Sequence, residues 1–333
     1  MTDASLPRVI PDRIPVRFAF WRRWEIILFG LAVLVFVFDA SASPHFLKPY
    51  TLSDATFNFT EKAIIAFAMA PLIIAGEIDL SVASIIALSS TAMGAAAAAG
   101  APPAALIAIA LTVGVVAGAF NGFIVTYFRV PSIVVTIGTM SLYRGIAYVV
   151  LGDQVYRSYP PAFDYFGQGY VFWVISFEFA LFVVLALIFG IVLHRTVFGR
   201  QIYVIGNNPV AAQFSGIRVD RIRRILFVLT GLMSGVASIL LTSRIASTRP
   251  TIASGFELDV VTMAVLGGVN ILGGSGTIPG VVIAAFVMGL VTFGLGLLNV
   301  PGIVQSVVVG TLLIAVIALP LVVSRLAEAL RRR

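Results

Sequence analysis

The chain has 333 residues, of which 59% are hydrophobic and only 11% are charged, whereas about 25% are charged in a typical soluble domain. The core of a soluble protein cannot cover that much apolar surface, so the net charge of +7 indicates basic loops beside a membrane and not nucleic-acid binding. With no Cys and only two His, the chain has no disulfide, thiolate nucleophile or His-rich metal site, and we expect no catalytic residue, metal or cofactor.

Ten segments approach the length of about 20 apolar residues that a membrane span requires. The basic segment 1–23 precedes them and lacks the apolar core of a signal peptide, so it predicts a cytoplasmic tail. The eighth segment is short and predicts a partial or tilted helix. In chain order the predicted spans are 24–40, 63–75, a Ser- and Ala-rich span ending near 99, 102–128, 131–151, 170–193, 225–242, 260–271, 278–298 and 302–323.

Clusters of Arg in 1–23, 195–224 and 324–333 predict three cytoplasmic regions, because basic residues collect on that side of a membrane. Six predicted spans separate the first two clusters and four separate the second and third. Both numbers are even, so all three clusters fall on one side. We therefore expect a single all-α, polytopic membrane domain over 1–333, with both termini cytoplasmic.

An internal duplication is suggested by the starts of the fifth and tenth spans. Residues 130–134 read Val-Pro-Ser-Ile-Val and residues 300–304 read Val-Pro-Gly-Ile-Val. In a chain of ten spans these two helices run in opposite directions, which predicts two inverted five-helix halves. The alternative is that Val-Pro is simply a common helix start, since Pro fits the first turn.

The second and third spans are separated by a polar break that contains Glu77 and Asp79, followed by Ser81 and Ser84. Acidic residues at membrane depth are costly unless they face protein or water. One interpretation is a broken helix that lines a solute pathway. In the other, Asp79 accepts the free N–H groups at the start of the next helix, and Glu77 pairs with a buried Arg.

Several further polar residues lie in or beside the spans. They predict hydrogen bonds either to a hydroxylated solute or to a neighbouring helix. Arg144 needs a partner inside its span, and Glu77 and Asp79 are the candidate acids. The predicted pathway residues, beyond those of the break, are Asn121, Thr136, Thr139, Arg144, Asn270 and Gln305.

A glycine-rich stretch at 267–280 holds six Gly in 14 residues. It contains no Lys and lacks the phosphate-binding Gly-x4-Gly-Lys-Ser/Thr pattern, so the chain shows no nucleotide site of its own. Small residues permit tight turns and close helix packing. We interpret the stretch as a re-entrant turn or a packing element, with direct solute contact as the alternative.

The basic stretch 195–224 contains a predicted short helix. Asn208 suits the N-cap, Pro209 the first turn, and Gly216 the end. Val210, Phe214 and Ile217 share one apolar face, which favours a protein groove as partner over a lipid surface. The residues predicted to couple the chain to that partner are Asn208, Pro209, Val210, Ala211, Ala212, Phe214, Gly216 and Ile217.

Three stretches, 76–83, 198–217 and 266–280, together resemble the permease subunits of bacterial ABC importers for monosaccharides, the ribose/xylose/arabinose permease family. Glu77 and Ala83 stand where that family usually has Gly, and the form of 76–84 is most similar to rhamnose permeases. The resemblance implies an ABC ATPase, a second permease subunit (the same or homologous) and a periplasmic sugar-binding protein as partners. It also implies that the helix near 209–216 docks on the ATPase.

These features predict a monosaccharide permease that works by alternating access, driven by the separate ATPase. The loaded binding protein would dock on the outer loops 41–60, 152–169 and 244–256. The alternative is an ion-coupled secondary sugar transporter, with Glu77 and Asp79 as proton or sodium ligands. A membrane-embedded enzyme is disfavoured, because the spans show no cluster of acids, His or nucleophiles.

Overall fold

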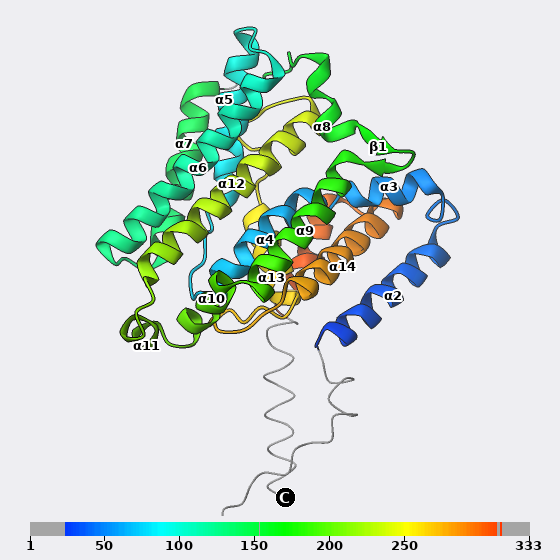
Figure 1. Ribbon diagram of the computed structural model, residues 1–333. Helices are drawn as coiled ribbons and strands as arrows, with labels where there is room; N and C mark the ends of the chain where they lie inside the picture. The colour runs from blue at the N-terminus through cyan, green and yellow to red at the C-terminus, as the bar shows by residue number, and fades with distance from the viewer. Residues whose placement is uncertain (1–23, 153, 312–313, 315–333) are drawn as a thin grey trace, which may run out of the picture.

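The computed structural model describes residues 24–152, 154–311 and 314, so the predicted tails 1–23 and 324–333 lie outside the described residues. The regular structure of the described part is helical apart from one short antiparallel hairpin and an isolated antiparallel bridge between Tyr156 and Thr248. Its elements, which Figure 1 shows in chain order, are α2 (Trp24–Ala42), α3 (Pro49–Phe57), α4 (Thr60–Ile74), α5 (Val82–Ala98), α6 (Pro103–Phe128), α7 (Ser132–Leu151), η1 (Pro161–Phe163), α8 (Tyr165–Gln168), β1 (Tyr170–Phe172), β2 (Ile175–Ser176), α9 (Phe177–Arg195), α10 (Val197–Asn207), α11 (Pro209–Phe214), α12 (Val219–Ile245), α13 (Phe256–Leu266), α14 (Ile278–Leu297) and a helix over Gly302–Thr311.

Six of the described helices, α2, α6, α7, α9, α12 and α14, are long and apolar enough to cross a membrane. Helices α3 and α4 form a pair bent by 46° that would make a seventh span, and α5 and the helix Gly302–Thr311 are shorter apolar helices. The predicted all-α polytopic membrane fold is confirmed. The tenth predicted span, 302–323, is described only at 302–311 and 314.

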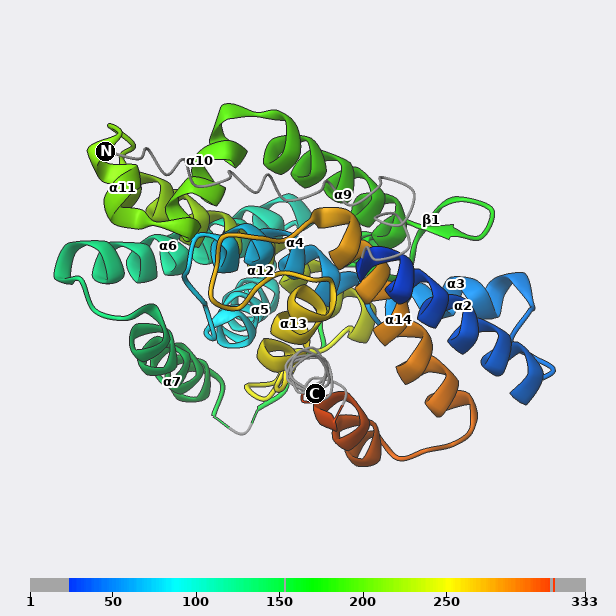
Figure 2. The ribbon, with the colours of Figure 1, turned by 90° about the horizontal axis from the view of Figure 1, so that it is seen from below.

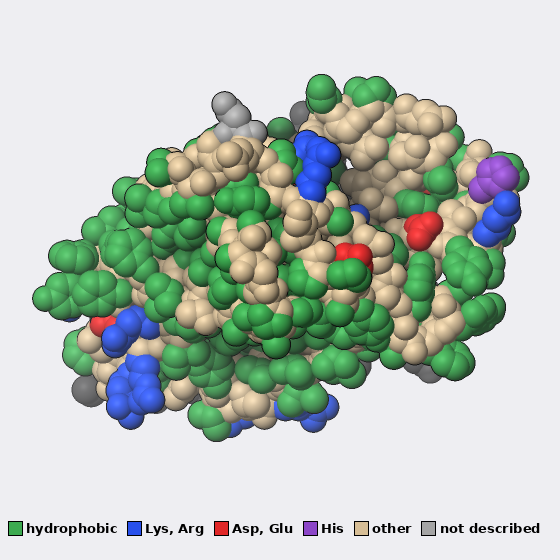
Figure 3. Space-filling model, turned by 90° about the horizontal axis from the view of Figure 1, so that it is seen from above, with side chains coloured by type: hydrophobic (Ala, Val, Ile, Leu, Met, Phe, Trp, Pro, Cys, Tyr) green, Lys and Arg blue, Asp and Glu red, His purple; other side chains and the backbone are tan. Residues whose placement is uncertain are grey.

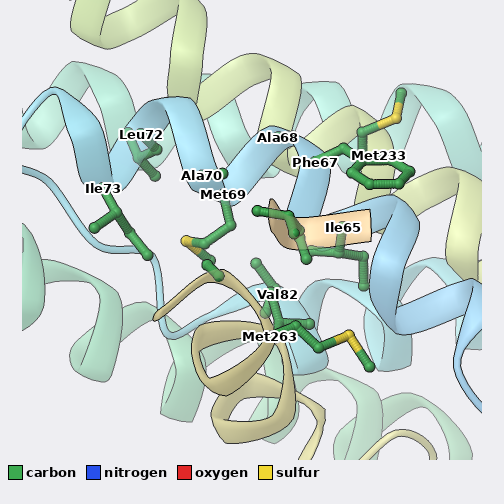
Figure 4. Close-up of a cluster of buried hydrophobic side chains, with 14 of the residues drawn as sticks. Ile65, Phe67, Ala68, Met69, Ala70, Leu72, Ile73, Val82, Met233 and Met263 are labelled. Atoms are coloured by element: carbon green, nitrogen blue, oxygen red, sulfur yellow. The ribbon is translucent and has the colours of Figure 1, made fainter. Parts of the chain in front are cut away.

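Helix α4 is the centre of the fold. After its polar first turn, its residues are apolar all round, and nearly all residues of the helix are buried, as expected for a helix enclosed by others. It packs against α12, α13, α9 and α14. Figure 4 shows Phe67 and Met69 of α4 within a cluster that also holds Val82, Met233 and Met263. The centre of the membrane domain is therefore a solid core of side chains.

Helices α6 and α12 pack closely because both present glycines at four-residue spacing. A methyl group added at Gly118 would meet the carbonyl oxygen of Phe227, and one added at Gly231 would meet that of Gly114. Such small-residue faces allow backbone-to-backbone contact between membrane helices. The glycines at 114, 118 and 122, within the fourth predicted span, therefore serve helix packing.

Three predicted boundaries are wrong. The sixth span begins at α9, after the hairpin, where the Ser176 side chain accepts the N–H of Phe179 at 3.2 Å. The eighth ends as the partial helix α13, at Leu266. The seventh is longer than predicted, because α12 extends from Val219 to Ile245.

The two ends of the molecule differ. Helices α10 and α11 lie at one end, together with the start of α2, whereas α8 and the β-hairpin lie toward the other. Figure 2 looks onto the end that carries α10 and α11. Figure 3 shows the opposite end, where the surface is hollowed and basic and acidic side chains lie near the hollow. A pocket of ≈ 430 Å³ lined by Arg244, Arg249 and Phe256 lies between α12 and α13.

Candidate functional site

The break between α4 and α5 is organised by the carboxylate of Asp79. Gly76 turns the chain with φ +85°, and Asp79 Oδ1 then accepts the backbone N–H of Ser81 at 2.8 Å and its hydroxyl at 2.6 Å. The Ser84 hydroxyl donates to the Ser81 carbonyl at 2.7 Å. Asp79 thus fixes the turn that leads into α5 by binding Ser81, the residue before the helix, and this local bonding favours the helix-start interpretation over a free carboxylate.

Two side chains from other helices complete this cluster. Asn121 of α6 donates through Nδ2 to Ser81 Oγ at 2.8 Å and to Asp79 Oδ2 at 3.3 Å. Tyr143 of α7 donates its hydroxyl to Asn121 Oδ1 at 3.1 Å. All four side chains are buried. The sequence analysis missed Tyr143, because an aromatic residue within an apolar span is more often part of the core; its hydroxyl, which needs a partner when buried, was the available signal.

The start of α7 holds the backbone of the same break. The N–H of Ile78 donates to Ser132 Oγ at 3.2 Å, and Thr136 Oγ1 donates to the Ile78 carbonyl at 3.4 Å. Thr139 bonds within its own helix, to the Thr136 carbonyl at 3.4 Å. Thus three predicted pathway residues, Asn121, Thr136 and Thr139, lie on the helices that surround the break, and the first two contact it directly.

Glu77 forms an ion pair with Arg223 of α12, with Oε1 and Nε 3.0 Å apart. The acid therefore has an Arg partner, as one of the two sequence interpretations requires, although the Arg223 side chain is only partly buried. Beside the pair lies a cavity of ≈ 350 Å³, lined also by Arg129, Pro209 and Gln213. Residues of the break and of α11 thus line the same cavity.

Three predicted pathway residues lie away from the break. The pairing of Arg144 with Glu77 or Asp79 is wrong: its Nη1 donates to the carbonyls of Pro250 and Ile252, each at 2.7 Å. The guanidinium therefore provides hydrogen-bond donors for two backbone carbonyls in the loop before α13. Asn270 is exposed and accepts the N–H of Leu272 at 3.0 Å. Gln305 donates to the Val300 carbonyl at 3.0 Å.

Helix α11 begins and ends as predicted. Asn208 Oδ1 accepts the N–H of Ala211 at 3.0 Å, Pro209 occupies the first turn, and Gly216 leaves the helix with φ +82°. Its predicted apolar face is divided, however. Phe214 is 90% exposed, whereas Ile217 packs against the main core. The reason is that Ile217 already belongs to the chain that returns toward α12.

Val210 is 60% exposed, so α11 presents two apolar side chains, Val210 and Phe214, to its surroundings. Ala212 is fully buried between α11 and the body. Helix α11 is thus anchored through a small residue and displays large ones. That arrangement suits a helix whose outer face contacts a partner.

The glycine-rich loop packs against α10 and the end of α4. The N–H of Gly274 donates to the Ile74 carbonyl at 2.9 Å, and a methyl group at Gly206 would collide with the same carbonyl. Tyr203 donates its hydroxyl to the Gly276 carbonyl at 2.7 Å, and burial raises the pKa of Tyr203. The geometry favours turn formation and packing at this loop.

A cluster of charges near the opposite end was not predicted. Arg244 of α12 donates to both carboxylate oxygens of Glu61, at 2.8 and 3.0 Å. Lys62 pairs with Asp259 at 2.6 Å. Glu178 is fully buried, and neither of its carboxylate oxygens has a hydrogen-bond partner. These residues lie at helix ends, where the sequence resembles ordinary span flanks.

Comparison with known proteins gives the chain a family context. The family model described as "Branched-chain amino acid transport system / permease component" matches residues 52–317. The ribose import permease protein of Bacillus subtilis (strain 168) is 35% identical over 291 residues, which cover 86% of this chain and 90% of that protein.

A second relative has a different named solute. The autoinducer 2 import system permease protein of Escherichia coli (strain K12) is 34% identical over 300 residues, covering 88% of this chain and 91% of that protein. The protein of the same description from Shigella flexneri matches equally. No solved structure matches the chain.

Proposed function

The chain belongs to the family of branched-chain amino acid transport system permease components, and from this premise we propose that it is the permease subunit of an ATP-driven importer for a monosaccharide or a related furanosyl signal. Membership of the family makes it a transport subunit and not an enzyme. The relatives are named for ribose and autoinducer 2 import, which supports a small, hydroxyl-rich solute. The form of residues 76–84 favours a rhamnose-like sugar within that class.

The observation that carries the proposal is the geometry of α11. Phe214 is 90% exposed at the end of the molecule to which the Arg-rich stretch 195–224 belongs. An apolar side chain held out on a capped helix beside basic residues fits a groove on a cytoplasmic protein. We assign that groove to a separate ABC ATPase, and we place both termini of the chain in the cytoplasm, with the bacterial inner membrane as its location.

The proposed mechanism is alternating access in a pair of permease subunits, the same or homologous. A sugar-binding protein would deliver the solute to the hollowed end in Figure 3. ATP binding would then move α11. Because residues of α11 and Glu77 line the same cavity, the motion would reach the break over a short distance. The ATPase can shift the equilibrium only if it binds α11 differently in its two nucleotide states.

The experiment that tests the proposal is purification of the tagged chain from its native membranes, with co-purifying proteins identified by mass spectrometry. Recovery of an ATPase with a Walker motif, followed by ATP-dependent uptake of radiolabelled rhamnose, ribose or autoinducer 2 in liposomes, is expected. A chain that is recovered alone and drives solute flux without ATP would overturn the proposal.

The second candidate is an ion-coupled secondary sugar transporter. It requires a carboxylate that is free to bind a proton or sodium. Glu77 is paired with Arg223, and Asp79 is occupied by Ser81 and Asn121, which disfavours both acids as ion ligands. Uptake that an uncoupler abolishes and ATP depletion leaves intact would select this candidate.

A further inference from the structure

A groove of ≈ 670 Å³ runs along the surface between α9 and α14. Its wall is almost wholly apolar and includes Phe182, Leu187 and Phe286. It follows nearly the whole length of α9, from Phe179 to Arg195, and the first half of α14. At its far end stand His194 and Arg195 of α9, opposite Ile278 and Pro279 of α14. The groove is therefore apolar along its length and basic at one end.

The basic end of the groove is closed by a tertiary hydrogen bond. His194 Nε2 accepts the backbone N–H of Ile278 at 3.2 Å, which ties the end of α9 to the start of α14. Arg195, the next residue, is exposed and is followed at once by α10, on the side of α11. The guanidinium thus lies where the apolar span meets the polar stretch 195–224.

A second groove allows a direct comparison. It lies next to the first, between α14 and α2, and both grooves are lined by Val282, Ile283 and Phe286. Its volume is ≈ 370 Å³, and no charged residue lines it. Both grooves are apolar, but only the one beside α9 has an arginine, Arg195, at one end.

We propose that the groove between α9 and α14 binds one anionic phospholipid of the cytoplasmic leaflet, with an acyl chain against Phe182 and Phe286 and its phosphate at Arg195. The occupant is inferred from charge complementarity: a hydrocarbon channel in a membrane protein is filled by an acyl chain, and an Arg at the interface selects a negative headgroup. The site is separate from the break at Glu77 and from α11, and its occupancy does not depend on which solute is carried.

One glycine makes the site testable without disturbing the core. A methyl group added at Gly190, which lines the groove, meets no atom within 4 Å. Gly190→Leu should therefore project into the groove and displace the lipid while the helix stays intact. Gly30 of α2 is equally open and is not part of either groove, so Gly30→Leu is the matched control.

The test is native mass spectrometry of the purified, delipidated full chain, titrated with phosphatidylglycerol and, separately, with phosphatidylcholine of the same acyl chains. We expect one phosphatidylglycerol per chain, bound more tightly than phosphatidylcholine. A cation near the surface contributes about 1 kcal/mol, so Arg195→Gln should weaken phosphatidylglycerol binding by about fivefold. Arg195→Lys should retain it, and Arg221→Gln, an exposed Arg outside the groove, should change nothing.

Gly190→Leu should abolish binding of both lipids, and Gly30→Leu neither. Equal affinity for the two lipids, or phosphatidylglycerol binding that survives Gly190→Leu, would reduce the groove to ordinary lipid-facing surface and overturn the proposal. The chain has no Cys, so paired Cys substitutions are clean probes. A cross-link between position 190 and a position in 1–23 would show that the chain's own N-terminal segment occupies the groove, which would also overturn it.

Discussion

Glu77 Oε1 and Arg223 Nε lie 3.0 Å apart and join the break after α4 to the start of α12. Because α12 follows α11 in the chain, a displacement of α11 reaches Arg223 within a few residues. The ion pair would then pass this displacement to the backbone of the break. The same backbone is held by hydrogen bonds to the side chains of Ser132 and Asp79. Glu77 stands where the sequence of the monosaccharide permeases usually has Gly. Under the proposed function, Glu77 therefore helps to couple the motion of α11 to the break.

Removing either member of this pair should weaken both stability and coupling. Glu77→Gln or Arg223→Gln leaves the other charge unpaired in a mostly buried place, so we expect the free energy of unfolding to fall by about 1–3 kcal/mol. We also expect ATP hydrolysis to continue with less sugar uptake per ATP. Thermal unfolding in detergent and uptake per ATP in liposomes measure the two effects.

Charge reversal gives the matched control. The double variant Glu77→Arg with Arg223→Glu should recover part of both losses, whereas Arg221→Gln, two residues away and exposed, should behave as wild type. If Arg221→Gln has the same effect as Arg223→Gln, general surface charge and not the pair is responsible.

Substitutions at two nearby positions of α11 should affect ATPase docking and helix stability separately. Phe214 is 90% exposed and Ala212 is fully buried. Phe214→Asp should leave the chain folded and inserted but abolish co-purification of the ATPase, because the charge enters the partner's apolar groove. Ala212→Asp should instead destabilise α11 itself, since it buries a carboxylate. ATPase recovery and limited proteolysis distinguish the two; full ATPase recovery with Phe214→Asp would contradict the docking role.

The glycine contact between α6 and α12 should tolerate no side chain. Gly231→Val places methyl groups against the Gly114 carbonyl, so we expect a loss of at least about 1–3 kcal/mol from overpacking. Gly145 of α7 has no atom within 4 Å of an added methyl group. Gly145→Ala should therefore be neutral or stabilising by up to about 1 kcal/mol. Thermal unfolding compares them, and equal effects would argue against close helix packing at Gly231.

Two buried glutamates should respond in opposite ways to the same substitution. Glu61→Gln breaks the two-oxygen contact with Arg244 and should lower stability by about 1–3 kcal/mol. Glu178 is fully buried with no hydrogen-bond partner, so Glu178→Gln removes a desolvated acid and should leave stability equal or higher. Thermal unfolding tests this; a large loss with Glu178→Gln would indicate that its carboxylate has a partner in the folded protein.

The features that the sequence predicted well depend on neighbouring residues. Apolar runs locate the spans, and the caps at Asn208, Pro209 and Gly216 locate α11, because each signal lies within a few residues of the element that it governs. Helix α10 was missed for a related reason. The basic stretch 195–224 contains polar residues that hide this helix in the sequence, whereas in the structure its Gly206 allows the close approach of α10 to Ile74.

Pairings between distant segments could not be predicted from one chain. Arg144 was expected to find an acid and instead finds two carbonyls more than 100 residues away. Tyr143 and Arg223 are unremarkable in sequence, and only the fold brings them to Asn121 and Glu77. A buried polar group requires a partner, but the sequence does not say which of several chemically equivalent groups will be near.

The contact of Gly206 and Gly274 with one carbonyl, that of Ile74, has a mechanical consequence. Side chains are compliant, because rotamers can change when two helices are pushed together. Here backbone meets backbone, and nothing between the segments can deform. We therefore expect helix α10, the end of α4 and the loop before α14 to move as one unit when α11 is displaced. A displacement of α11 should therefore shift the end of α4 at Ile74 by a similar amount.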